Sequence, residues 1–326
     1  MNYRLLGRTG LKVSEVGYGC WGVGGGVKNP RWADMWKADD IESREALRKA
    51  FMMGVNFYDT AWVYGDGHSE KLVGELLREH PEIIVATKVP PKNREWPARL
   101  DVPAGEVFPK DYVIEYAKKS YNNLGRKIDL LQLHVWSDKW VNDEGWQESF
   151  DELKKENIIR FTGVSINDHA PETALKLVAS GKVDCLQVIY NIFDQSPEDE
   201  LFRVAKKNNI GIIARVPLDE GSLTGKFTYD TKFDDWRKYY FSGNRLKETI
   251  DRVEKLRFLE GKNKTLAQAA LQFILANDAV STVIPGMRKG AHVVDNVKAS
   301  EGKISEKELK ELRKHRWDRN FYYEGI

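Results

Sequence analysis

Short runs of hydrophobic residues recur along the whole chain. Most of them show no alternation of apolar and polar positions, which is typical of parallel strands covered on both faces. Gly, Pro and charged residues separate the runs from the segments between them. We therefore expect eight strands, at Ser14–Cys20, Val55–Thr60, Ile83–Val89, Asp129–Val135, Phe161–Ile166, Cys185–Tyr190, Ile210–Val216 and Ser281–Pro285.

The segments between the runs have apolar residues at helical spacing. In Ser43–Met53, for example, Leu47 and Phe51 fall on one face of a helix. Similar patterns predict helices at Ser69–His80, Tyr112–Leu124, Trp146–Glu156, Pro171–Ala179, Leu201–Lys207, Leu266–Asn277 and Ala291–Ala299. Eight strand–helix units indicate an α/β protein with a closed (β/α)8 TIM barrel, although the pattern alone also fits an open doubly wound sheet.

Three segments stand outside this regular pattern. Tyr3–Val13 reads as an N-terminal β-hairpin that could cap the bottom of the barrel. The longest interruption, Leu218–Lys264, becomes helical around Arg245–Leu259. Ser305–Trp317 predicts a further C-terminal helix, and an aromatic tail, Phe321-Tyr322-Tyr323, follows it.

Composition and charge narrow the class of protein. The chain has 326 residues, of which 41% are hydrophobic and 31% charged, and no linker or low-complexity segment divides it, so we expect one domain over 1–326. A net charge of +2 gives no electrostatic reason to expect a nucleic-acid or membrane partner. Two cysteines argue against a disulfide framework, and neither a signal-peptide core nor a membrane-length apolar run occurs. These features predict a cytoplasmic protein.

Four residues whose side chains can take part in acid–base chemistry come at or just after predicted strand ends. Asp59, Lys88 and His134 end the second, third and fourth hydrophobic runs, and Tyr64 follows Asp59 by five residues. In a parallel barrel, strand ends at one face carry the chemistry. A phenol could protonate a carbonyl oxygen, a nearby ammonium would lower its pKa, and an imidazole could hydrogen-bond the substrate. Singly, each residue could be structural; their occurrence at consecutive strand ends favours a catalytic set.

A second group of residues is suited to a dinucleotide. Ser165, Asn167 and Gln187 could bind an amide, and the glycines and hydroxyls of Gly221–Lys226 suit phosphate contacts. Arg288 lies just before a predicted helix N-terminus, where an anion is favoured. No GxGxxG follows a strand, so a Rossmann domain is not supported.

Together these residues form a recognisable pattern. They are Asn56-Phe57-Tyr58-Asp59-Thr60-Ala61, Tyr64-Gly65, Thr87-Lys88, Gln132-Leu133-His134, Gly163-Val164-Ser165, Pro217-Leu218 with Gly221–Lys226, and Ile284-Pro285-Gly286 with Arg288 and Asn296. In this order they resemble the aldo-keto reductase family over essentially the whole chain, in a bacterial-type variant. The resemblance implies a (β/α)8 barrel and NADPH-linked reduction of an aldehyde or ketone.

The resemblance also implies roles for individual residues. Tyr64 would be the general acid, Lys88 and Asp59 its tuning pair, and His134 the residue that orients the carbonyl. The substrate would lie against Trp21, Trp96, Trp136 and the loop Gly24–Lys37. The cofactor NADPH or NADP+ would contact Gly19, Cys20, Trp21, Ser165, Asn167, Gln187, Arg215, Val216, Pro217, Leu218, Gly221, Ser222, Leu223, Thr224, Gly225, Lys226, Gly286, Arg288, His292, Asp295 and Asn296.

Some positions depart from the common family pattern. Arg215 replaces the aromatic residue that often stacks on nicotinamide, and His292 stands where glutamine is frequent. Ile166 offsets Asn167 from the usual Ser-Asn pair, and Cys20 reads as a buried, inert thiol.

Two other functions fit parts of the pattern. One is an NADPH-binding regulatory subunit with little turnover, against which the intact catalytic set weighs. The other is a metal-dependent barrel hydrolase, which needs a cluster of His and Asp ligands. Only His134 is well placed among the six histidines and no H-x-H occurs, so we expect no metal site. The sequence selects neither a particular small-molecule carbonyl substrate nor an oligomeric state.

Overall fold

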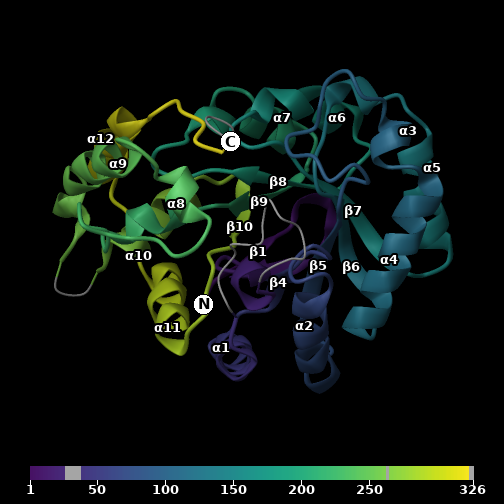
Figure 1. The fold of residues 1–326 in the computed structure, drawn as a ribbon, viewed down its shortest axis with the longest axis horizontal. Coiled ribbons are helices and arrows are strands. Elements are labelled where there is room, and N and C mark those ends of the chain that lie inside the picture. The colour runs from purple at the N-terminus through teal and green to yellow at the C-terminus, as the bar shows by residue number, and fades with distance from the viewer. Residues whose placement is uncertain (26–37, 262–263, 323–326) are drawn as a thin grey trace.

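The structure is a computed structural model that describes residues 1–25, 38–261 and 264–322. Its centre is a parallel sheet in which each strand pairs with the next along the chain (Figure 1). The strands are β3 (Tyr18–Gly19), β4 (Phe57–Asp59), β5 (Ile84–Val89), β6 (Ile128–Leu133), β7 (Ile159–Ser165), β8 (Cys185–Ile189), β9 (Gly211–Arg215) and β10 (Val280–Val283). Parallel bridges from Val16 to Val283 and from Gly19 to Gly286 join the two edges. The sheet therefore closes, and the predicted barrel is confirmed.

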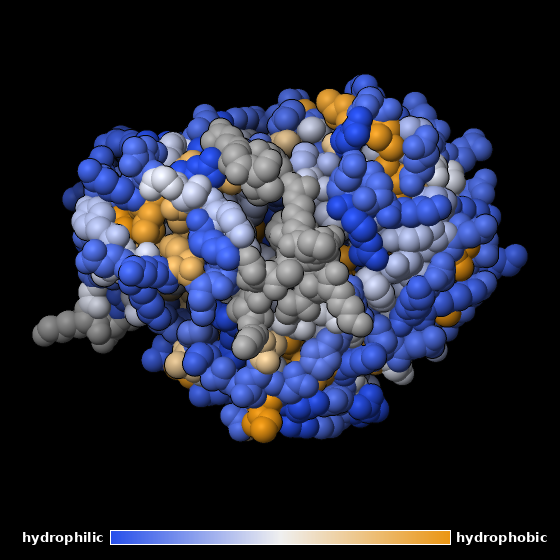
Figure 2. All heavy atoms as spheres, in the orientation of Figure 1, coloured by the Kyte–Doolittle hydropathy of each residue, from blue (hydrophilic) through white to orange (hydrophobic). Residues whose placement is uncertain are grey.

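A helix follows each strand and covers the outside of the sheet (Figure 1). These helices are α1 (Asp40–Met52), α2 (His68–Glu79), α4 (Lys110–Leu124), α5 (Gly145–Lys155), α6 (Leu175–Ser180), α7 (Leu201–Lys207), α10 (Leu266–Leu275) and α11 (Gly290–Val297). Outward strand residues pack against the apolar faces of the helices, which explains why the strands do not alternate in sequence. No helix in the described ranges is both long and apolar enough to cross a membrane. The face in Figure 2 is mainly hydrophilic, with separate hydrophobic patches.

The amino-terminal end of the barrel is closed by the predicted hairpin. Strands β1 (Tyr3–Leu5) and β2 (Lys12–Ser14) pair antiparallel. Between and beside them, Leu6, Leu11 and Val13 are buried in one cluster with inward-facing residues of the barrel strands. The predicted first strand, Ser14–Cys20, was too long, because Ser14 belongs to the hairpin and Cys20 begins a 3-10 helix.

Further helices extend the carboxyl-terminal half of the chain. They are α8 (Arg237–Tyr240), α9 (Arg245–Glu254) and α12 (Glu306–Leu312), which Figure 1 shows grouped at one side of the barrel. The expected helices around Arg245–Leu259 and Ser305–Trp317 are present but shorter. Single-turn helices such as α8 and α3 (Ala104–Val107) were not predicted, because one turn has too few residues to show a period.

The interior of the barrel changes from apolar to polar along the strands. Ile84, Ala86 and Leu130 belong to the buried apolar cluster above the hairpin. The next inward positions, two residues further along each strand, are Lys88 and Gln132, which lie side by side in the sheet register. Polar side chains therefore gather at the carboxyl ends of the strands.

Candidate active site

A buried lysine is the centre of this polar layer. Lys88 has no solvent-exposed side-chain surface, and its Nζ donates to Asp59 Oδ2 at 2.5 Å and to the Thr60 carbonyl at 3.0 Å. A third contact, 3.4 Å long, joins Nζ to the Tyr64 hydroxyl. Burial acts to lower the pKa of Lys88, but the negative charge of Asp59 and the contact with Tyr64 outweigh it, so the pKa is raised. The ammonium therefore stays charged beside the phenol.

The other carboxylate oxygen of Asp59 is satisfied by two glutamines. Gln132 Nε2 lies 3.1 Å and Gln187 Nε2 2.8 Å from Asp59 Oδ1. Gln187 was expected to hold the carboxamide of a cofactor; the structure places it on the cavity wall with its amide nitrogen directed at Asp59. Gln132 belongs to the family pattern, but the sequence assigns it no role. Its inward position, two residues after Leu130, is the signal that identifies its place in this layer.

Tyr64 is positioned by a turn rather than by a strand. A Cβ atom at Gly24 would lie only 2.4 Å from the Tyr64 carbonyl oxygen, so the close packing of these segments requires glycine. The ring lies edge-on to His134, with centroids 6.1 Å apart. Burial raises the pKa of Tyr64 and Lys88 opposes that rise, with a net increase. The expected lowering by the lysine is therefore present, but burial exceeds it.

His134 is neutral near neutral pH. Burial lowers its pKa well below the usual value, and the positive charges of Lys88, Arg215 and Arg94 act in the same direction. Its Nδ1 atom is buried and has no hydrogen-bond partner among the residues that the structure describes. Trp96 packs edge-on against the imidazole at 5.7 Å between centroids. A neutral imidazole at this place can donate a hydrogen bond from its N–H group to a substrate oxygen.

A cavity of about 640 Å³ opens over this layer. It brings together most of the predicted residues from distant parts of the sequence. Those lining it are Gly19, Cys20, Trp21, Asp59, Tyr64, Trp96, His134, Ser165, Asn167, Gln187, Arg215, Val216, Pro217, Leu218, Gly221, Thr224, Lys226, Gly286, Arg288, His292, Asp295 and Asn296. Lys88 lies beneath the wall and reaches the cavity through Tyr64.

A few predicted cofactor residues lie off this cavity. Ser222 is buried, and its hydroxyl donates to Asp219 Oδ2 at 2.6 Å. Leu223 is fully buried in the core, and Gly225 lies against Arg257. Their neighbours Gly221 and Thr224 line the cavity instead.

The prediction that Trp136 forms a substrate wall was wrong. Its side chain is completely buried, packs edge-on against Trp140 and Trp146, and does not line the cavity. The strand ends at Leu133, so the alternation that directs His134 inward does not extend to residue 136. Residues 26–37 of the predicted wall loop and Tyr323 lie outside the described ranges.

Sequence reasoning missed several lining residues, most of which come from irregular loops and the carboxyl-terminal tail. They are Gly22, Val63, Asp66, Arg94, Pro97, Val135, Ile166, Asp168, Glu220, Phe227, Trp236, Arg237, Ala267 and Tyr322, of which Arg237 and Ala267 lie in α8 and α10. Ile284 and Pro285, which belong to the family pattern, line the cavity as well. Tyr322 belongs to the aromatic tail; its hydroxyl donates to Glu220 and its ring stacks with Trp236.

Hydrogen bonds to neighbouring loops fix the side chains of Arg215 and Asn167. Arg215 Nη2 lies 2.6 Å from Asp168 Oδ1 and 2.9 Å from the Ile166 carbonyl. Asn167 accepts from the Ala98 amide at 3.1 Å and donates to a main-chain carbonyl at 2.9 Å. Asn167 therefore clamps the loop after β5 to the cavity wall.

Cations gather at the part of the cavity formed by β10 and α11. Burial lowers the pKa of His292, and Lys226, Arg288 and Lys289 lower it further. Glu42 offsets part of this positive charge, since it lies 3.4 Å from Lys289 Nζ. Positively charged side chains on a cavity wall can bind a phosphate through charge-assisted hydrogen bonds.

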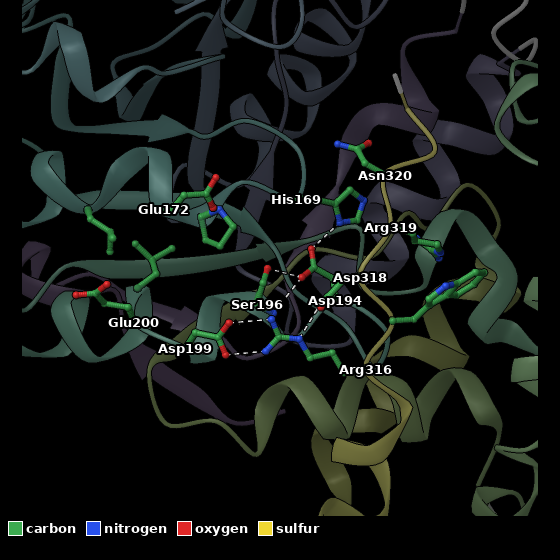
Figure 3. A pocket seen from close by; sticks show the side chains of 14 residues that line it. His169, Glu172, Asp194, Ser196, Asp199, Glu200, Arg316, Asp318, Arg319 and Asn320 are labelled. Carbon is green, nitrogen blue, oxygen red and sulfur yellow. Dashed lines mark hydrogen bonds and ion pairs between the residues drawn. The ribbon is translucent and has the colours of Figure 1, made fainter. Parts of the chain in front are cut away.

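A second cavity, of about 410 Å³, lies under the carboxyl-terminal tail (Figure 3). His169 Nδ1 lies 2.6 Å from Asp194 Oδ2, and Arg316 forms two contacts with Asp199 at 2.6 and 2.8 Å. None of the four catalytic candidates lines this cavity. In the described ranges, no cluster of three or more His, Cys, Asp or Glu side chains is arranged to hold a metal ion.

The sequence and the fold match known proteins. The family model "Aldo/keto reductase family" covers residues 15–316. An uncharacterized oxidoreductase, YqkF, from Bacillus subtilis is 30% identical over 97% of this chain and 96% of its own. The NADH-specific methylglyoxal reductase of Escherichia coli is 27% identical over 94% and 96%. The holo form of aldo-keto reductase AKR11C1 from Bacillus halodurans superimposes with a TM-score of 0.73 at 26% identity, covering 97% and 96%.

Proposed function

This chain belongs to the aldo/keto reductase family, and on that premise we propose that it reduces an aldehyde or ketone to an alcohol with NADPH and with Tyr64 as general acid. One observation carries the proposal. A fully buried, charged Lys88 contacts both Asp59 and the hydroxyl of Tyr64, at the edge of a cavity of about 640 Å³. A structural ion pair alone would not need a phenol and a neutral imidazole at the same point.

The residues divide the work of the reaction. A bound nicotinamide supplies the hydride that reduces the carbonyl carbon. Tyr64 keeps its proton near neutral pH because its pKa is raised, and it gives that proton to the substrate oxygen. Lys88 stabilises the phenolate that remains, at 3.4 Å from the hydroxyl. Neutral His134 hydrogen-bonds the substrate oxygen and orients it.

The cavity wall fits a dinucleotide. Ser165 and Asn167 lie at the nicotinamide end in this proposal, and Gly221, Thr224 and Lys226 follow the pyrophosphate. Arg288 would meet the 2′-phosphate that distinguishes NADPH from NADH, since a guanidinium binds a phosphate with paired hydrogen bonds. The preference for NADPH in this chain therefore depends on Arg288, whereas one relative is named as NADH-specific.

The test pairs the wild-type protein with Tyr64→Phe, which removes only the hydroxyl. Purified protein is assayed with NADPH, with NADH and with a panel of aldehydes and ketones. We expect consumption of NADPH by the wild type and a loss of about 10²–10⁴-fold in kcat for the variant, with unchanged cofactor Kd. Binding of NADPH without turnover of any carbonyl would instead favour the regulatory subunit. If Tyr64→Phe keeps more than about a tenth of the activity when chemistry limits the rate, Tyr64 is not the acid.

A further inference from the structure

The positive charges near the catalytic set are not equally compensated. Lys88 is neutralised by Asp59 at 2.5 Å, and Arg215 by Asp168 at 2.6 Å. A third cation, Arg94, lines the same cavity. Within the described residues, no carboxylate lies within ion-pair distance of its guanidinium.

Arg94 is held in place by neutral groups instead. Its guanidinium lies over the rings of Trp62 and Tyr116, 5.1 and 5.6 Å from their centroids. Its Nη2 also donates to the Tyr116 hydroxyl at 3.0 Å. Aromatic faces and a phenol orient an arginine without cancelling its charge. The side chain is therefore fixed, partly buried and still positive.

The backbone of Arg94 supports the same conclusion. Its φ of 58° lies in the left-handed region, which residues other than glycine adopt uncommonly. The turn is fixed on both sides of Arg94: Arg94 N donates to the Pro91 carbonyl, and Trp96, two residues on, packs against His134. Arg94 and Trp96 thus belong to one loop, and both line the cavity.

Arg94 is also close enough to act on the catalytic imidazole. Its charge is one of those that lower the pKa of His134. The groups attributed to the cofactor phosphates, such as Arg288 and Lys226, come from the opposite half of the barrel, from β9 onward. Arg94 comes from the loop after β5, so a cofactor on the other wall would not use its charge.

We propose that the carbonyl substrate carries an anionic group, a carboxylate or a phosphate, and that Arg94 binds this group while Tyr64 and His134 hold the carbonyl oxygen. This inference rests on the proposed function and adds the substrate class. A cation fixed in a cavity gains charge-assisted hydrogen bonds when such an anion enters. With a neutral carbonyl compound of the same size, the N–H groups of Arg94 other than the one that donates to Tyr116 would hydrogen-bond only to water, and binding would gain nothing from them.

The test compares matched substrates. One pair is 4-carboxybenzaldehyde and its neutral methyl ester, and the other is glyceraldehyde 3-phosphate and glyceraldehyde, so that the carboxylate and phosphate sources are separated. Each is assayed with wild type, Arg94→Gln, Arg94→Lys and Arg99→Gln. Arg99 is the control, since it lies on the same loop but is mostly exposed and paired with Asp101.

We expect the wild type to favour at least one anionic member, and Arg94→Gln to lose about ten- to a hundred-fold in kcat/KM for that member only. Arg94→Lys should recover part of the loss and Arg99→Gln should show none. No preference in the wild type, or equal losses for the anionic and neutral members, would overturn the inference.

A binding measurement separates this inference from the proposed function. If no carbonyl compound is turned over, the proposed function fails by itself. Binding of 4-carboxybenzaldehyde and of glyceraldehyde 3-phosphate to the cofactor-saturated protein, followed by tryptophan fluorescence, still tests the anion site. Weaker binding of either compound in Arg94→Gln than in Arg99→Gln supports it, and equal binding, or none, for both compounds refutes it. Thermal melting of each variant checks that the fold is intact.

Discussion

Replacing Lys88 by methionine should separate the structural role of the buried ion pair from its catalytic role. Methionine has a similar length but no charge, so it leaves Asp59 buried without its cation. Breaking one partner of a buried pair typically costs about 3–5 kcal/mol. Here Gln132 and Gln187 still donate to Asp59 at 3.1 and 2.8 Å, so we expect the loss in free energy of unfolding to lie near the lower end, about 3 kcal/mol.

The double variant Lys88→Met/Asp59→Asn measures the coupling free energy between the two residues. Asp59→Asn alone leaves the buried ammonium without its counter-charge and should also cost about 3 kcal/mol. In Lys88→Met/Asp59→Asn neither charge remains, so the total loss should be smaller than the sum of the two single losses by about 2 kcal/mol or more. Urea unfolding of the four proteins measures this coupling. Additive losses would show that the 2.5 Å contact contributes no coupling energy.

The catalytic part of the same prediction concerns Tyr64. At 3.4 Å and an effective dielectric constant of about 20, the attraction between ammonium and phenolate is about 5 kcal/mol at most. Without it, the pKa of Tyr64 rises further above its already raised value, and the phenol becomes a weaker acid. We expect kcat to fall by about 10²–10⁴-fold. A folded Lys88→Met protein with an unchanged pH–rate profile would refute the tuning role.

Three further predictions test other parts of the site. Arg288→Ala should weaken NADPH by about ten- to a hundred-fold and leave NADH nearly unchanged, as measured by fluorescence quenching; equal losses would make Arg288 structural. Burial raises the pKa of Glu220 from 4.5 to about 7, so the folded protein holds this proton more tightly than the unfolded chain does. The free energy of unfolding should therefore fall as the pH rises through that range. Glu220→Gln should therefore flatten the fall in melting temperature between those pH values, and an unchanged slope would contradict this. Trp136→Phe should cost about 1–3 kcal/mol in urea unfolding without changing KM, and a change in KM would restore it to the substrate wall.

The sequence predicted the order of strands and helices because both kinds of element are long enough to show a pattern. Runs such as Ile83–Val89 and periodic segments such as Ser69–His80 correspond closely to β5 and α2. The direction in which each strand residue points was hidden, because outward residues are as apolar as inward ones beneath the helices. The ends of elements were predicted less accurately, as at Ser14, which belongs to the hairpin and not to the first barrel strand.

The site was predictable where it depends on strand ends and not where it depends on loops. Asp59, Lys88 and His134 could be placed on one face because parallel strands end together. Arg94 could not be found, since the turn that holds it has no period. Trp136 was misplaced because an aromatic residue after a strand does not reveal whether it faces the cavity or the helices.

The polar layer explains how the barrel tolerates a buried charge pair at its centre. Asp59 accepts hydrogen bonds from three side chains that belong to β5, β6 and β8, so its two oxygens are held from across the barrel. The negative charge of Asp59 raises the pKa of Lys88, and a charged Lys88 can stabilise a phenolate at Tyr64. The two glutamines therefore act on the acid through Asp59 without touching it. Lys88 is paired with an Asp59 whose other donors come from strands that the sequence separates by more than forty residues, which is why only the closed barrel reveals its full environment.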